Sequence, residues 1–271
     1  MIIERAVQFG EGRRLSGVLT RATTLPLHGA IGLVNSGFIP RSGPARVYTQ
    51  LARRLAQHGI ASLRFDLGGL GDSIGSTDGR LVDRTRTETG AAVEVMAAEL
   101  PGIPLALGGI CSGAEDSFRQ AESDPRIHAT VLIDPFAWRT RGFAWRHTRH
   151  RLYRWSLRAL GIWSPRTSLS EPDWVNFKHM ERDEAGRILQ ALVTREATTH
   201  FIYTGGRREL FNHLGQLAKM LPDIPMGERI TVDFLPELGH TQLLQEDRDR
   251  LIETIVRRLT TSLSPRASHP R

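Results

Sequence analysis

A glycine-flanked cysteine between a strand-like and a helix-like segment constrains the fold more than any other feature. The run Gly109–Gly113 (GICSG) follows the apolar residues Pro104–Leu107, which predict a buried strand, and precedes the helix-forming residues Ala114–Ser123. A residue at the apex of a sharp strand-to-helix turn needs small neighbours two positions away on each side, because the backbone is strained and closely packed there. The pattern therefore predicts a tight turn with the side chain of Cys111 at its tip.

Strand-like and helix-like segments alternate along most of the chain. Two strand-like segments come first, and helix-like segments lie between most of those that follow. Strands are predicted at Ile2–Phe9, Leu15–Thr20, Ala30–Val34, Ala61–Phe65, Leu105–Gly109, Ala129–Ile133, His200–Tyr203 and Ile230–Leu235, and helices at Ala45–Gln57, Thr87–Leu100, Ala114–Ser123, Leu210–Met220 and Asp247–Thr260. This order predicts an α/β fold: a mostly parallel eight-stranded sheet with helices on both faces. Ligands bind such sheets at the carboxyl ends of the strands.

Composition narrows the class of protein. A hydrophobic content of 40% and a charged content of 24% are ordinary for a globular chain of 271 residues. No apolar stretch approaches the roughly 18 residues that span a bilayer, and Met1–Arg5 lacks the order of a signal peptide. A single cysteine excludes an internal disulfide, and no Cys/His cluster has zinc-ligand spacing. We therefore expect a cytoplasmic protein with no metal and no cofactor.

The segment 136–197 differs in composition from the rest of the chain. The formal net charge is +7, yet Trp138–Arg166 alone contains eight arginines and no Asp or Glu. All five tryptophans lie between Trp138 and Trp174. We therefore divide the chain into a core (residues 1–135 and 198–263), an inserted helical cap (136–197) that is expected to cover the site, and a disordered tail (264–271).

Four motifs, in this order, resemble those of the α/β-hydrolase superfamily. Asn35–Phe38 (NSGF) occupies the place of its oxyanion segment, Asp66–Ser73 (DLGGLGDS) resembles its Asp-x-x-Gly-x-Gly-x-Ser loop, Gly109–Gly113 resembles its nucleophile elbow, and Leu238–His240 (LGH) resembles its catalytic-histidine turn. The resemblance extends over roughly Leu15 to Leu259. With Cys in place of the usual Ser, the chain is similar to a cysteine-nucleophile variant found among bacterial hydrolases and thioesterases.

The resemblance implies a catalytic role for Cys111 and His240. Cys111 would attack an acyl carbon, since a helix N-terminus and an imidazolium lower the pKa of a thiol and favour the reactive thiolate. The alternative interpretation is an unreactive cysteine that packs as a small hydrophobe. His240, which follows a strand and precedes a long helix, would be the general base.

Two carboxylates are candidates for the acid that orients His240. The superfamily usually places this residue just after the strand that ends near Thr204, where the nearest carboxylate here is Glu209. Asp134, at the end of the preceding strand, is the alternative, because some members take the acid from that position. Each also has a structural interpretation, as a helix N-terminal acid for Glu209 and as a turn residue for Asp134.

The resemblance also implies an oxyanion hole made of backbone N–H groups. One donor is expected from Ser112, one residue past the apex of the turn. The other is expected from Phe38 or from Gly37. Losing one such donor typically raises the barrier by about 3 kcal/mol.

The insertion contains a predicted amphipathic basic helix from Trp145 to Trp163. Its apolar residues recur at helical intervals, and Arg146, Arg154 and Arg158 belong to a second stripe. The helix is interpreted either as a cap packed on the sheet or as a contact with substrate or partner. In the second case it would bind an acidic carrier protein, the phosphates of coenzyme A, or an anionic membrane surface. No nucleic-acid-binding motif accompanies the arginines.

These features predict a cysteine-dependent acyl hydrolase or acyltransferase. The predicted substrate is a small acyl compound, either an ester or a thioester of coenzyme A or of an acyl-carrier protein. The predicted intermediate is an acyl-cysteine. One alternative is a carboxylester or lactone hydrolase with a small-molecule substrate and a purely structural cap. The other is a catalytically inactive scaffold, an interpretation favoured by the absence of an Asp near Glu209.

Overall fold

An eight-stranded sheet forms the middle layer of the protein. The computed structural model describes residues 1–75, 80–162 and 180–263. The strands lie in the order β1-β2-β4-β3-β5-β6-β7-β8; β1 and β2 form an antiparallel hairpin, β2 pairs antiparallel with β4, and all other pairs are parallel. Their bounds are β1 Ile2–Phe9, β2 Leu15–Ala22, β3 Gly29–Val34, β4 Ile60–Phe65, β5 Leu105–Ile110, β6 Ile127–Ile133, β7 Thr198–Thr204 and β8 Ile230–Leu235.

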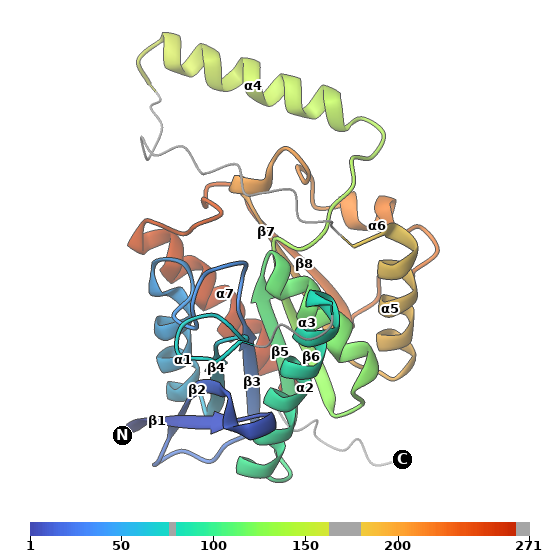
Figure 1. Ribbon diagram of the computed structural model, residues 1–271. Helices are drawn as coiled ribbons and strands as arrows, with labels where there is room; N and C mark the ends of the chain where they lie inside the picture. Colours follow the sequence, from blue (N-terminus) through green and yellow to red (C-terminus); the bar gives the residue numbers. More distant parts are fainter. Residues whose placement is uncertain (76–79, 163–179, 264–271) are drawn as a thin grey trace, which may run out of the picture.

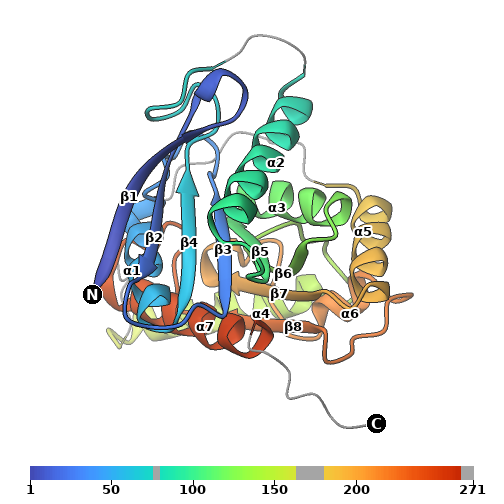
Figure 2. The same ribbon diagram turned by 90° about the horizontal axis from the view of Figure 1, so that it is seen from below.

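Helices cover both faces of this sheet, as Figures 1 and 2 show. They are α1 Val47–Gln57, α2 Leu81–Glu99, α3 Ser112–Ser123, α4 Phe143–Ala159, α5 Arg182–Thr194, α6 Gln216–Met220 and α7 Gln245–Leu263, with short 3-10 turns at Glu11–Arg13, Pro44–Arg46 and Gly205–Arg207. Buried apolar residues of α1 and α7 form one core cluster with the sheet. Those of α2, α3, α5 and α6 form a second cluster on the other side. The layering explains why the strands are continuous apolar runs: both of their faces are covered.

The predicted strands are all present, and two of the helices predicted outside the segment 136–197 need correction. α2 begins at Leu81, earlier than the predicted Thr87. The predicted helix Leu210–Met220 is reduced to α6, which begins at Gln216. Its first half is a turn instead, because the side chain of Gln216 accepts a hydrogen bond from the backbone N–H of Asn212 (3.0 Å) and donates one to the carbonyl of Leu210 (2.6 Å). A side chain that satisfies backbone groups in this way competes with helix formation.

The predicted insertion 136–197 contains two helices in different environments. α5 packs in the core through Ile188, Leu189 and other apolar residues, as an ordinary crossover helix between β6 and β7. α4 stands apart from the layers at the edge of the molecule (Figure 1) and buries only Phe143. The division into core and cap stays a prediction. The predicted basic helix Trp145–Trp163 is α4, which begins at Phe143 and ends at Ala159. It ends there because Gly161 adopts a positive φ of 70°, which a helix cannot continue. Trp163 itself and the predicted tail 264–271 lie outside the described residues.

None of the helices within residues 1–75, 80–162 and 180–263 combines the length and the apolar character that a bilayer-spanning segment needs.

Candidate active site

Cys111 lies at the apex of a strained turn between β5 and α3. Its backbone dihedral angles are φ 55° and ψ −119°, a conformation that costs a non-glycine residue about 1–3 kcal/mol. The backbone N–H of Cys111 donates to the carbonyl of Ile133 in β6 (2.8 Å), and its carbonyl accepts from the N–H of Ala114 (3.0 Å). These hydrogen bonds hold the turn, and the strain is typical of a functional position.

Residues 109 and 113 have to be glycine, because neither position has space for a Cβ atom. A Cβ added to Gly109 would lie 2.4 Å from the carbonyl carbon of Gly113. A Cβ added to Gly113 would lie 2.3 Å from the carbonyl oxygen of Asn35, at the end of β3. Helix α3 therefore starts in direct backbone contact with β3 and β5, as the Gly109–Gly113 pattern predicts.

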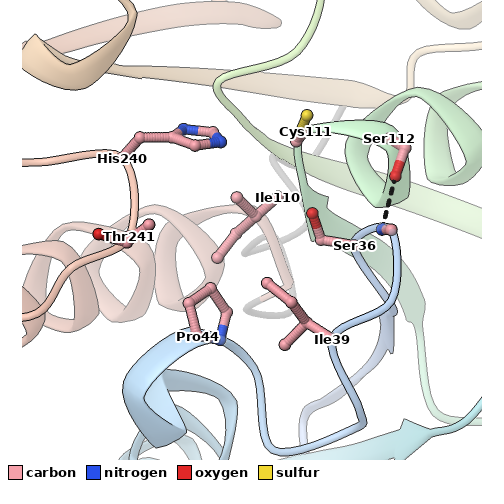
Figure 3. Close-up of a pocket in the computed structure, with 9 residues that line it drawn as sticks. Ser36, Ile39, Pro44, Ile110, Cys111, Ser112, His240 and Thr241 are labelled. Atoms are coloured by element: carbon pink, nitrogen blue, oxygen red, sulfur yellow. Dashed lines mark hydrogen bonds between the residues drawn. The ribbon is translucent and has the colours of Figure 1, made fainter. Parts of the chain in front are cut away.

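His240 follows β8 and its imidazole extends toward Cys111 (Figure 3). Its Nδ1 is hydrogen-bonded to Oδ2 of Asp134 at 2.7 Å, which leaves Nε2 for the cysteine. Burial by itself lowers the pKa of His240, but the hydrogen bonds to Asp134 and Cys111 and the negative charges of these two groups outweigh it and raise the pKa to about 10. The site therefore favours an imidazolium.

Asp134 is held at the end of β6 in a fully buried position. Besides its hydrogen bond with His240, it accepts one from the backbone N–H of Thr204 and one from the Thr204 hydroxyl, each 2.6 Å long. Its own φ is 46°, which turns the carboxylate back across the end of β7. A buried carboxylate with three donors is fixed in place and oriented.

Glu209, the first choice for the acid, lies elsewhere. Its side chain is 52% exposed and faces Arg207 at 3.6 Å, while its backbone carbonyl accepts from Arg139 (3.1 Å). The space beside His240 is taken by the loop after β7, where a Cβ added to Gly206 would lie 2.2 Å from the backbone nitrogen of His240. The structure thus brings Asp134, and not Glu209, to the histidine.

The two candidates for the second oxyanion donor differ in their hydrogen bonds. The N–H of Gly37 donates to the hydroxyl oxygen of Ser112 at 2.9 Å, so it is engaged (Figure 3). Phe38 lies in the turn closed by the hydrogen bond from the N–H of Ile39 to the carbonyl of Ser36 (2.9 Å), with its side chain 77% exposed. The backbone of Phe38 remains the better candidate. Ser112, the first residue of α3, has its N–H at the helix N-terminus, where amides have no partner within the helix.

A buried ion pair supports the turn Ser36–Ile39 that contains Phe38. Asp66, after β4, accepts from the backbone N–H of Arg41 (2.6 Å) and pairs with the Arg41 guanidinium, which also contacts Asp72 at 2.5 Å. Asn35 links the same two loops by accepting from the N–H of Leu67 (2.7 Å). The sequence motif Asp66–Ser73 predicted a loop at this place. The contribution of Arg41 was missed, because nothing in the sequence pattern pairs it with the two aspartates.

Tyr48 is a second supporting residue that the sequence reasoning missed. Its buried hydroxyl accepts from the backbone N–H of Ile110 (2.9 Å) and donates to the carbonyl of Val34 (3.1 Å). These are the last residues of β5 and β3. The hydroxyl therefore joins the ends of the two strands that lead into Cys111 and into the turn Ser36–Ile39. The sequence indicated only that Tyr48 lies in a predicted helix.

A small, mostly apolar pocket lies between these elements (Figure 3). It encloses about 390 Å³, the solvent at its mouth included. It is lined by Ser36, Gly37, Ile39, Pro44, Ile110, Cys111, Ser112, His240 and Thr241. Cys111 is partly exposed to it, unlike a cysteine that only fills a core.

The arginines predicted to contact a substrate or partner all lie on α4, and none of them lines this pocket. Arg146 donates to the side chain of Asn212 (3.0 Å). Arg154 lies near His150, whose pKa is lowered to about 4 by burial and by the charges of Arg208 and Arg154. Arg158 is exposed in the last turn of the helix.

Within the described parts of the chain, no three His, Cys, Asp or Glu side chains come together in a group that could hold a metal ion. The polar side chains that line the pocket with Cys111 are those of Ser36, Ser112, His240 and Thr241.

Comparison with known proteins identifies the fold. No family model matches the sequence, and no curated protein matches it. An esterase from Pyrococcus furiosus superposes with a TM-score of 0.63 at 13% identity, over 97% of this chain and 92% of that chain. For a dienelactone hydrolase from Anabaena variabilis the TM-score is 0.61 at 13% identity, over 96% of this chain and 98% of that chain. For an α/β serine hydrolase without lid from Xanthomonas campestris it is 0.59 at 15% identity, over 98% and 97%.

These similarities, with the observed sheet order, establish that the protein has the α/β-hydrolase fold. The predicted fold class is confirmed. In chain order the candidate site consists of Cys111, Asp134 and His240, placed after β5, β6 and β8.

Proposed function

We propose that this protein hydrolyses small carboxylic esters or lactones through an acyl-Cys111 intermediate. The observation that carries the proposal is the placement of Cys111 and His240 beside a small apolar pocket, with the imidazole extending toward the cysteine and hydrogen-bonded to Asp134. The kind of substrate is supported by structural neighbours that are described as esterases and as a dienelactone hydrolase. The interpretation as an inactive scaffold loses its main support, since Asp134 takes the place of an acid near Glu209.

In the first half of the reaction the Cys111 thiolate attacks the carbonyl carbon. A C–S bond forms, and the carbonyl oxygen becomes an oxyanion that the N–H groups of Ser112 and Phe38 stabilise. When this intermediate collapses, the C–O bond breaks and the leaving alkoxide takes the proton from the His240 imidazolium. The raised pKa of His240 suits this step, because the proton is present on the ring at neutral pH.

In the second half, water releases the acyl group. Acylation removes the negative charge of the sulfur, which is one of the contributions that raise the pKa of His240. The pKa of the histidine therefore falls in the acyl-enzyme, and its neutral form accepts a proton from water. The hydroxide equivalent attacks the acyl carbon, the C–S bond breaks, and the thiolate–imidazolium pair is restored. Asp134 orients the ring throughout by its hydrogen bond to Nδ1.

Thioesters are a second candidate class of substrate, favoured by the cysteine itself. Attack of a thiolate on a thioester exchanges one C–S bond for another, so the acyl-cysteine forms with little energetic penalty. Transfer of the acyl group to an acceptor other than water would follow the same steps. The small size of the pocket favours a short acyl group for either class.

The proposal is tested with p-nitrophenyl acetate, dihydrocoumarin and acetyl-coenzyme A as probes. Intact-protein mass spectrometry after a short incubation should detect one added acetyl group with the first probe, and peptide mapping should place it on Cys111. Turnover of the ester and the lactone should vanish in Cys111→Ala. Acylation by acetyl-coenzyme A alone would favour the thioester class, and the absence of any adduct and any turnover would refute a hydrolase.

A serine variant separates the nucleophile from the fold. Cys111→Ser keeps a side chain of similar size at the turn but replaces the thiolate by an alcohol that needs a general base before it attacks. We expect its acylation rate to fall strongly while its thermal unfolding stays close to that of the wild type. Equal rates for Cys111→Ala and the wild type would overturn the assignment of Cys111.

A further inference from the structure

Helix α4 turns its apolar side away from the protein. Its outward residues include Trp145, Leu152 and Trp155, whose exposed fractions are 64%, 61% and 70%. At 100° per residue these three positions fall within about 80° of one another, on one side of the helix. A helix of a globular protein normally turns this side to the core.

The opposite side of α4 is attached to the domain by polar and aromatic contacts. Phe143 is the only buried residue of the helix and stacks on His147 at 5.8 Å between ring centroids. The guanidinium of Arg146 donates to Asn212 (3.0 Å), and the Asn212 amide donates to the carbonyl of Phe143 (3.3 Å). The orientation of the helix is therefore set by contacts at its N-terminal half, and its apolar side is left unpartnered in the described structure.

The charge of α4 has one sign only. The helix contains five arginines, at positions 146, 149, 151, 154 and 158, and no Asp or Glu. Arg149 lies over the ring of Trp145, with 4.6 Å between the guanidinium carbon and the ring centroid. A helix with Trp and Leu on one side and arginines around them is suited to lie in the headgroup region of an anionic bilayer.

We propose that α4 docks the protein on the surface of a bilayer that contains anionic phospholipids. The apolar side enters the boundary between headgroups and acyl chains, while Arg149 and Arg151 contact the phosphates. The helix forms the outer edge of the molecule (Figure 1), so its apolar side can reach a flat surface before the rest of the domain does. This inference is independent of the proposed ester hydrolysis.

A lipid surface fits these observations better than a second copy of the chain. Two copies that met through α4 would bring ten arginines together, five from each, with no carboxylate on either helix. Such like-charge contact opposes association. A single protruding helix also offers a ridge, which a fluid surface accommodates readily, rather than a groove that would receive a partner helix.

The test is co-sedimentation with vesicles made of equal parts phosphatidylglycerol and phosphatidylcholine. The wild type should bind these vesicles, should not bind vesicles of pure phosphatidylcholine, and should be released by salt. Because each arginine near an anionic surface contributes about five-fold, Arg149→Gln with Arg151→Gln should weaken binding on the order of 30-fold. Trp145→Ala with Trp155→Ala should weaken it about ten-fold or more.

The matched control carries the same loss of charge away from α4. Arg13 and Arg21 are exposed residues of the first hairpin region, so Arg13→Gln with Arg21→Gln should leave vesicle binding within about two-fold. Equal weakening by this control would overturn the proposal in favour of general charge attraction. So would an absence of binding by the wild type, or a dimer without lipid that Trp155→Ala abolishes. Equally tight binding to polyglutamate, unaffected by the tryptophan variants, would point to an acidic protein partner instead.

Discussion

Gly206, after β7, lies directly against the loop that carries the candidate histidine. A Cβ placed on Gly206 would lie 2.2 Å from the backbone nitrogen of His240 and 2.6 Å from its Cβ. The first contact involves backbone, which cannot move aside by a change of rotamer. Gly206→Ala is therefore a perturbation of the histidine position that leaves Cys111, Asp134 and His240 chemically intact.

The size of the effect follows from the distances. Ordinary contact for a Cβ begins at 3.4 Å, so the loop that carries His240 has to move by about 1.2 Å, the difference between 3.4 Å and 2.2 Å. A misplacement of about 1 Å at a catalytic group reduces the rate about 100-fold. Overpacking of this kind costs about 1–3 kcal/mol of folding stability, which leaves a typical domain folded.

The assay is the rate of acylation by p-nitrophenyl acetate, followed as the initial release of p-nitrophenolate, together with thermal unfolding. Gly186→Ala is the matched control, since a Cβ on Gly186 would meet only Leu221, at 3.8 Å. Gly186 lies inside helix α5, where alanine is favoured over glycine by about 1 kcal/mol. We expect Gly186→Ala to keep full activity and to unfold at a slightly higher temperature.

Full activity in Gly206→Ala would refute the reasoning, because it would mean that the position of His240 does not limit acylation. A folded variant with about 100-fold slower acylation and intact alkylation of Cys111 by iodoacetamide would support it. Loss of folding in Gly206→Ala would contradict the expected cost of about 1–3 kcal/mol.

Three further outcomes are expected. Asp134→Asn removes the hydrogen bond and the charge that raise the pKa of His240. The alkaline limb of the acylation rate should therefore move to lower pH, and the rate should fall about 100-fold. Glu209→Gln should change neither the limb nor the rate in the same pH titration. Ser112→Ala removes the acceptor for the Gly37 N–H and should cost about 1 kcal/mol in urea unfolding, with less than ten-fold loss of rate, because the oxyanion donor is the backbone. Arg41→Met leaves a buried carboxylate without its countercharge and should destabilise the fold by about 3 kcal/mol, measured by the same unfolding.

The sheet could be predicted from sequence because its strands are buried on both faces. Runs such as Leu105–Ile110 are continuously apolar, and hydrophobic burial is dictated locally by residue type. The helices that resisted prediction are those whose ends are set by tertiary contacts. α6 starts late because Gln216 bonds to the backbone of the preceding turn, and α5 was hidden within a segment whose unusual composition comes from α4.

The candidate site could be predicted where its residues lie in recognisable local sequence patterns. Cys111 and His240 sit in local patterns, a glycine-flanked turn and a Gly-His pair before a long helix, and the structure brings both residues together. The acid could not be chosen, because Asp134 and Glu209 follow adjacent strands and only the fold decides which one reaches the histidine. One signal was present: Gly205-Gly206 after β7 offers no side chain and fits a loop that passes close to another backbone.

The position of Asp134 after β6 and the glycines after β7 are structurally connected. Because β7 lies between β6 and β8 in the sheet, the histidine loop after β8 has to cross the end of β7 to reach Asp134 after β6. Backbone contact at Gly206 is what makes this crossing possible. A carboxylate moved to the usual place, in the double variant Asp134→Asn with Gly206→Asp, should therefore not restore acylation, since any side chain there displaces the histidine it is meant to orient. Recovery above the rate of Asp134→Asn alone would contradict this account of the site.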